Sequence, residues 1–267
     1  MTALRFLFAA SLAANVPSFA FAQHPPLGPG PSWRGPVRPA GQNEVFATGD
    51  GCAMCHSVAP RAMAMRSQTG EDVSPHGLWR GSVMANSFRD PYWRATVQKE
   101  IAAAPEQALE VQALCLRCHA PMAHHSRRIA GQDQVAVAAL IDDPLAQDGV
   151  SCTVCHQIKP DELGNETTFD GKGRIGKERV IFGPFADPAV GPMRMHASYT
   201  PTHGEHVRSS ALCATCHTLH TDHQGERFPE QTPYLEWRNS VFTDEPEKTA
   251  TSRSCQECHM AELAPTR

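Results

Sequence analysis

Apolar residues fall into short runs broken by proline, glycine and polar residues, and the one distinctive run lies at the N-terminus. A largely apolar stretch over 6–12 follows Arg5 and leads to Ala20, Phe21 and Ala22. A basic residue, an apolar stretch and an Ala-x-Ala site in this order are typical of a secretory signal peptide. We therefore expect residues 1–22 to be a signal peptide and the mature chain to begin at Gln23.

The alternative for this stretch is a retained membrane anchor. Asn15 and Pro17 interrupt it, and it is shorter than the roughly 20 apolar residues that span a bilayer. No other stretch of the sequence approaches that length. We expect an exported protein with no membrane span after cleavage, located in the periplasm or else at the cell surface or outside the cell.

Further along, the pattern predicts short helices and long connections. Asp90 and Pro91 predict the start of a helix that ends near Ala103, and Pro105 opens a second helix over 106–119. Other short elements are expected as helices over 134–141, 204–219, 231–241 and 249–260, and as a small β-hairpin over 174–182. The predicted fold is mainly α with extensive irregular coil.

Composition changes the picture of the interior. Aromatic residues make up 7% of the chain and the mean hydropathy is −0.37, so few apolar side chains are available for burial. We expect a lead-in over 23–50, and we expect its part at 23–42, which is rich in proline and glycine, to pack little. The predicted domain covers 51–267, with something other than side chains filling its middle.

Charge excludes one class of partner. Cleavage of the signal removes Arg5 and no acid, which leaves 23 basic and 28 acidic residues and a net charge of −5. Nucleic acid is therefore not an expected partner. A protein partner with a basic docking face is favoured.

All ten cysteines fall into five Cys-x-x-Cys pairs, and a histidine follows every pair. We number these motifs 1 to 5 in chain order. They are Cys52, Cys55 and His56; Cys115, Cys118 and His119; Cys152, Cys155 and His156; Cys213, Cys216 and His217; and Cys255, Cys258 and His259.

Disulfides, zinc and haem compete as explanations. Disulfide chemistry gives no reason for the histidine. Structural zinc takes four ligands from paired sets, and ten cysteines with five histidines do not divide into such sets. Haem c explains all three residues, because two thiols bond to the vinyl groups of one porphyrin and the histidine binds its iron. The sequence thus predicts five covalently attached haems, with short helices wrapped around them.

Several segments resemble a known family. They are WRGSVMANSFRDP at 79–91, DGVSCTVCH at 148–156, and CATCHTL at 213–219 with Glu236 and Trp237 after it. These segments resemble bacterial multihaem cytochromes c, and within that class the relatives of the tetrahaem cytochrome that accepts electrons from hydroxylamine dehydrogenase. The resemblance implies an exported haem protein and is compatible with both carriers and enzymes. A fifth motif departs from the tetrahaem pattern.

Histidines outside the motifs are candidates for the sixth ligand of each iron. The strongest is His206, seven residues before Cys213. Those that follow are His76, His196, His220 and His124, of which the last adjoins His125. The alternative for each of them is a solvated histidine in a loop that binds no iron.

An iron with two histidine ligands is saturated and exchanges electrons. The predicted function is electron transfer between exported redox proteins through weak, transient contacts. The alternative is a multihaem oxidoreductase with one open haem that acts on a small nitrogen or sulfur compound. A subunit of an extracellular cytochrome filament is a third class. The sequence predicts no oligomeric state.

Overall fold

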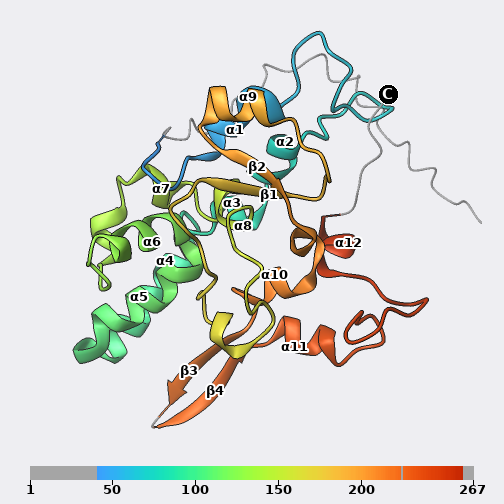
Figure 1. Ribbon diagram of the computed structural model, residues 1–267. Helices are drawn as coiled ribbons and strands as arrows, with labels where there is room; N and C mark the ends of the chain where they lie inside the picture. The colour runs from blue at the N-terminus through green and yellow to red at the C-terminus, as the bar shows by residue number, and fades with distance from the viewer. Residues whose placement is uncertain (1–40, 224, 261–267) are drawn as a thin grey trace, which may run out of the picture. The chain divides into compact units, whose positions relative to one another are not determined.

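Short helices carry most of the regular structure. The computed structural model describes residues 41–223 and 225–260 (Figure 1), and the predicted mainly α fold with extensive coil is confirmed. The α-helices are α1 (Gly49–His56), α2 (Pro75–Arg80), α3 (Val83–Asn86), α4 (Pro91–Ala103), α5 (Ala108–His119), α6 (Pro121–Ile129), α7 (Pro144–Gln147), α8 (Cys152–Cys155), α9 (Val190–Ala197), α10 (Ser210–Ala214), α11 (Pro233–Arg238) and α12 (Cys255–His259). Four 3₁₀ turns join them among the described residues: η1 (Pro105–Gln107), η2 (Val137–Leu140), η3 (Glu166–Thr168) and η4 (Glu205–Arg208).

Local signals set the helices around motif 2. The Asp90 carboxylate accepts a hydrogen bond from the backbone N–H of Tyr92 at 2.9 Å, and Pro91 stands in the first turn. An Asp cap followed by proline is a favourable helix start. The expected helix that begins at Pro91 is confirmed as α4, and the expected helix over 106–119 is confirmed as η1 followed by α5.

Two expected helices are shorter than the sequence predicts. The only helical elements in the stretch 204–219 are η4 and α10, and the only one in 249–260 is α12. Ser209 has extended backbone and caps α10 through a hydrogen bond from the Ala211 N–H. The Cys255 N–H donates to Ser210 Oγ at 2.9 Å, so a tertiary contact fixes both helix starts and overrides local propensity.

Strands form two separate pairs. Strand β1 (Val180–Gly183) pairs in parallel with β2 (Thr200–His203), and β3 (Leu219–His223) pairs antiparallel with β4 (Glu226–Gln231). The prediction of a hairpin over 174–182 is therefore wrong, because its second half lies in β1, which pairs with β2 on the far side of α9 in the chain. The Arg179 guanidinium donates to the carbonyls of Ala197 and Ser198, each at 3.1 Å, and holds the two ends of that crossover together.

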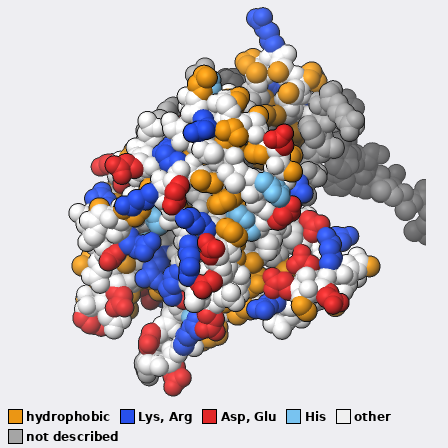
Figure 2. Space-filling model, in the orientation of Figure 1, with side chains coloured by type: hydrophobic (Ala, Val, Ile, Leu, Met, Phe, Trp, Pro, Cys, Tyr) orange, Lys and Arg blue, Asp and Glu red, His pale blue; other side chains and the backbone are white. Residues whose placement is uncertain are grey.

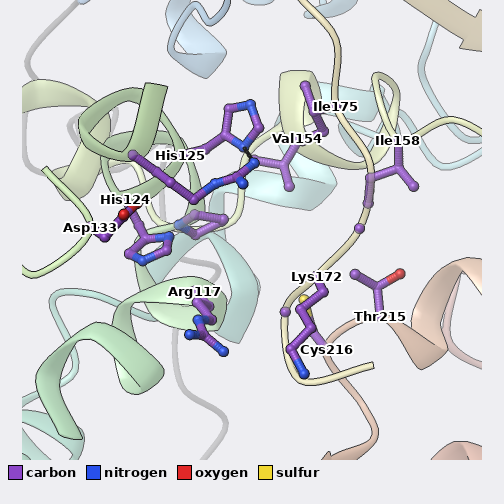
Figure 3. A pocket seen from close by; sticks show the side chains of 14 residues that line it. Arg117, His124, His125, Asp133, Val154, Ile158, Lys172, Ile175, Thr215 and Cys216 are labelled. Carbon is purple, nitrogen blue, oxygen red and sulfur yellow. Dashed lines mark hydrogen bonds between the residues drawn. The ribbon is translucent and has the colours of Figure 1, made fainter. Parts of the chain in front are cut away.

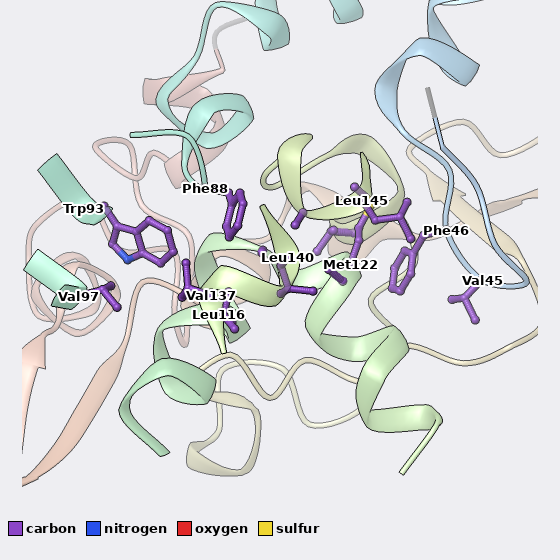
Figure 4. Close-up of a cluster of buried hydrophobic side chains, with 14 residues drawn as sticks. Val45, Phe46, Phe88, Trp93, Val97, Leu116, Met122, Val137, Leu140 and Leu145 are labelled. Carbon is purple, nitrogen blue, oxygen red and sulfur yellow. The ribbon is translucent and has the colours of Figure 1, made fainter. Parts of the chain in front are cut away.

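A cluster of apolar side chains surrounds motif 2 (Figure 4). Phe88, Leu116 and Met122 in this cluster are fully buried. The helices α4, α5 and α6 contribute to it together with residues from the segments around them, and α5 packs against both of the other helices. Part of the middle of the fold is thus ordinary side-chain core, which the composition did not predict.

The end of the expected lead-in belongs to this core. Val45 and Phe46 are buried in the same cluster, and Thr48 accepts a hydrogen bond from the Gly41 N–H. Residues 41–50 of the expected 23–50 lead-in thus contribute to the core, because two of their apolar side chains are buried in it. The expected signal peptide and the rest of the lead-in lie outside the described residues. No helix in the described ranges has the length and apolar content needed to cross a membrane.

Candidate cofactor-attachment sites

Each of the five motifs lies on a helical turn. Motifs 1, 2 and 5 end α1, α5 and α12, motif 3 forms α8, and motif 4 runs from α10 into the following turn. Residues three apart on a helix face the same side, so both thiols of a motif point to one place. All ten cysteines are in the described part of the chain, and none of them forms a disulfide. The repeated donor set is two thiols and one imidazole.

Motif 3 is held from the segment before α1. Thr153, between the two cysteines, donates from Oγ1 to the Ala47 carbonyl at 2.9 Å. Gln157, after the motif histidine, donates to the Val45 carbonyl at 3.1 Å. Both side chains are buried. The segment before α1 therefore anchors this turn on both sides.

Motif 1 lies against motif 3. Helix α1 packs on α8, and the thiols of Cys52 and Cys152 hydrogen-bond to each other, which raises the pKa of Cys52 and lowers that of Cys152. The pKa of His56 is lowered by burial and by the neighbouring His156. Two complete donor sets thus meet here.

Motifs 4 and 5 form a second contact of this kind. Helix α10 packs on α12. A hydrogen bond between the Cys213 and Cys255 thiols raises the pKa of Cys213 and lowers that of Cys255 to about 6. The pKa of His217 is lowered by burial and by His259.

Motif 4 also contacts motifs 2 and 3. The Cys216 thiol hydrogen-bonds with Cys118, which together with burial raises the pKa of Cys216. Burial, and then the Cys216 thiol, raise the pKa of Cys155 to about 12. Motif 4 therefore lies at the junction of the other sets, next to motifs 2, 3 and 5, while motif 1 adjoins motif 3.

In two motif histidines, the ring nitrogen Nδ1 lies against a backbone carbonyl oxygen. His156 Nδ1 lies 2.7 Å from the Phe182 carbonyl oxygen, and His119 Nδ1 lies 3.2 Å from that of Ser87. A carbonyl only accepts, so Nδ1 carries the proton in each contact and Nε2 keeps a lone pair. Metal-binding histidines show this arrangement, with the second nitrogen donating to a carbonyl. The residues present therefore fit an iron porphyrin bound through two thiols and one imidazole.

The structure distributes the candidate sixth ligands widely. His76 Nδ1 lies 3.2 Å from Ser57 Oγ, directly after motif 1. His206 Nε2 donates to the Ile158 carbonyl at 2.9 Å, close to motif 3. His206 does not share a helix with motif 4 as expected, because η4 and α10 are separate elements.

His196 and His220 take other positions. His196 is exposed on α9. His220, on β3, accepts a hydrogen bond from Arg227 at 3.1 Å and lies 3.5 Å from an Asp170 carboxylate oxygen. His196 therefore lies at the surface, and His220 is held by its contact with Arg227.

His124 and His125 lie together on α6 and line a cavity beside motif 4 (Figure 3). Each is 8% exposed. Burial and the nearby Arg117 and Arg128 lower the pKa of His124 to about 4, and burial and Arg128 do the same for His125. Both imidazoles are therefore neutral near pH 7, the form that binds a metal.

Sequence reasoning missed three contributors to these sites. The Ser87 and Phe182 carbonyls orient motif histidines. Every residue has a backbone carbonyl, so the sequence does not indicate which of them lies beside a given side chain. Lys172 lines the cavity together with Arg117. No sequence pattern marks a single lysine in a loop as part of a site.

Comparison with known proteins gives little further guidance. No family model matches the chain, and no curated protein matches it. A solved structure that matches is a pentahaem cytochrome c552 from Thermochromatium tepidum, at 20% identity and a TM-score of 0.48. The alignment covers 81% of this chain and 54% of that one, so the chain spans about half the length of that protein.

Proposed function

We propose that this chain is an exported electron-transfer protein that carries five haems c, one at each motif. The observation that carries the proposal is the fivefold donor set on helical turns, with Nδ1 of His119 and His156 already directed to carbonyls. The resemblance of the sequence to multihaem cytochromes c supports the same assignment. The signal-like N-terminus supports a periplasmic location.

Attachment needs no further reactant. Each thiol adds across a porphyrin vinyl group, so that one S–C bond forms and the thiol hydrogen goes to the other vinyl carbon. No atom is lost and no electron is transferred. When bound, the iron supplies reversible one-electron exchange. The residues of the chain hold the ring, supply the axial nitrogen and set the polarity around it.

The contacts between motifs define a route. A motif cysteine would bond to the edge of its own porphyrin, so neighbouring motifs would hold their porphyrins close together. Helix α1 of motif 1 packs on α8 of motif 3, residues of motifs 3 and 4 line one cavity, and α10 of motif 4 packs on α12 of motif 5. Motif 2 joins at motif 4. We propose that electrons follow the order 1–3–4–5, with haem 2 as a branch.

The two ends of this route lie at the surface. Cys55 of motif 1 and Cys258 of motif 5 are exposed, whereas the other eight cysteines are partly covered. Acidic and basic side chains are interspersed over the face drawn in Figure 2. Such a surface favours brief contacts with redox partners over permanent association.

Two measurements on the exported, matured protein test the proposal. Intact mass should equal the mature chain plus five haems, and low-temperature EPR of the oxidised protein should show five low-spin irons. A colourless protein or a zinc-containing one would overturn the assignment. One high-spin iron that changes on addition of nitrite or hydroxylamine would instead support the catalytic alternative.

A further inference from the structure

The cavity beside motif 4 lacks the donor set that a haem attached at a motif requires. A porphyrin attached there would lie against both cysteines and the histidine of its motif. Of the ten motif cysteines, all in the described part of the chain, only Cys216 lines the cavity, and none of the five motif histidines does. Its volume is about 440 Å³, within the range of roughly 300–1,000 Å³ usual for small-molecule sites. The lining therefore points to a ligand other than an attached haem.

One wall of the cavity is a tight glycine segment. A Cβ on Gly171 would come within 2.5 Å of Arg117 Cβ, and one on Gly173 within 2.7 Å of Thr215 Cγ2. The Gly171 N–H donates to the Thr215 carbonyl at 2.8 Å. This wall is therefore fixed against motifs 2 and 4, and the space beside it is preformed.

The charged side chains of the lining are mainly cationic. Arg117, Arg128 and Lys172 face one acid, Asp133 (Figure 3), which leaves a net charge of +2. Lys172 also pairs at 3.0 Å with Asp170, which lies outside the lining. Neither arginine forms an ion pair with a described residue. The cavity thus has an excess of one to two positive charges, and arginine pairs well with carboxylates.

A nearly buried imidazole adds a hydrogen-bond donor to this cationic side. His124 is 8% exposed and lines the cavity, and its ring makes no hydrogen bond with the described residues. Its electrostatic neighbours are Arg117, Arg128 and Asp133. A neutral imidazole carries one N–H donor. An anion in the cavity would therefore supply the acceptor that the described chain does not.

The rest of the lining includes an apolar wall. Val154, Ile158 and Ile175 line the cavity, and the first two are each 3% exposed. Figure 3 shows Val154 and Ile175 on the other side of the cavity from Arg117. An inorganic ion would leave this wall in contact with water, whereas a carbon chain would cover it. The two sides together suit an anion with an apolar part.

We propose that this cavity binds a small organic dicarboxylate. Its carboxylates pair with Arg117, Arg128 and Lys172 and accept a hydrogen bond from His124, while its carbon chain packs on the apolar wall of Val154, Ile158 and Ile175. A dianion balances the net charge of the lining. Binding is non-covalent, and no electron or proton is transferred. The site is additional to electron transfer and requires no iron ligand.

Isothermal titration of the full, haem-loaded protein with succinate tests the proposal. Succinamide is the matched neutral probe, and sulfate is the matched dianion without a carbon chain. We expect one succinate per chain, no binding of succinamide, and binding of sulfate about tenfold weaker or less, because sulfate does not cover the apolar wall. Sulfate that binds as tightly as succinate would refute the organic ligand. No binding of succinate would overturn the site, and this is the result expected if haem propionates already occupy its cations.

Two adjacent arginines of α6 locate the binding. Arg128 lines the cavity, whereas Arg127 does not and instead pairs with Asp143 at 3.7 Å. Arg128→Gln should weaken succinate binding by about tenfold or more, the effect of losing a charged hydrogen bond, and Arg127→Gln should leave it unchanged. Equal effects in both variants would overturn the assignment.

A second variant keeps the test decisive. If Arg128→Gln does not fold, Lys172→Gln replaces it, because Lys172 is an exposed loop residue that also lines the cavity. It should likewise weaken succinate binding, and unchanged binding would count against the site. Haem content is read separately by intact mass, so a wild-type protein without five haems would overturn the proposed function whatever the binding result.

Discussion

The imidazole of His119 lies flat against the indole of Trp93, with ring centroids 4.5 Å apart and ring planes 9° from parallel. Trp93 is buried and also contacts Phe88 at a centroid distance of 5.6 Å. The apolar cluster therefore reaches the donor set of motif 2 and fixes the rotation of its histidine.

Replacing this indole should affect both stability and one haem. Trp93→Ala should lower the free energy of unfolding by about 3–5 kcal/mol, the usual cost of removing a large buried aromatic. One low-spin EPR signal should also shift, because the imidazole loses its stacked neighbour. Chemical denaturation and EPR measure the two effects. The control is Tyr92→Ala, an 81% exposed neighbour, which should change stability by less than about 0.5 kcal/mol. Equal losses in both variants would contradict the stacking role.

Two glycines in α1 should respond in opposite directions to alanine. A Cβ on Gly49 would come within 2.3 Å of the Trp79 ring, so Gly49→Ala should destabilise the protein by about 1–3 kcal/mol through overpacking. A Cβ on Gly51 meets its nearest atom at 3.7 Å. Gly51→Ala should therefore stabilise the helix by about 0.5–1 kcal/mol. Thermal unfolding of both variants checks this, and a stabilising Gly49→Ala would contradict the described packing.

The cap of α12 should make a measurable contribution to the free energy of unfolding, because Ser254 is buried and bonded in both directions. Ser254 Oγ accepts from the Glu257 N–H at 3.2 Å, and the Glu257 carboxylate accepts from the Ser254 N–H at 2.7 Å. Ser254→Ala should cost about 1 kcal/mol, whereas Ser254→Thr keeps a cap oxygen and should cost less. Equilibrium denaturation compares the two. Identical stabilities would show that the capping box contributes nothing.

Removing attachment sites should separate the end of the route from its middle. Cys255→Ala with Cys258→Ala should give a folded protein that is one haem lighter, because motif 5 is on an exposed turn. Cys152→Ala with Cys155→Ala should give much less soluble protein, because Thr153 and Val154 between those cysteines are buried. Intact mass and yield of the exported protein are the measurements. A reversed order would contradict motif 3 as an internal site.

The sequence by itself determined the chemistry and the helices around motif 2. Five Cys-x-x-Cys-His triplets are local, since every atom of a donor set comes from one helical turn. The start of α4 at Pro91 is also local, because the cap and the proline act within a single turn. These features need no contact with distant residues, so the sequence alone is enough to predict them.

Tertiary structure alone decided which motifs meet and where each histidine outside them lies. The contacts of Cys52 with Cys152 and of Cys118 with Cys216 join residues about a hundred positions apart, and no sequence pattern encodes them. The hairpin over 174–182 failed for the same reason: β1 found its partner beyond α9. The segment at Val45 is buried although the sequence before it is rich in proline, because its two apolar side chains pack into a core formed by distant residues. Burial and long-range pairing are properties of the assembled chain, so the sequence alone did not predict them.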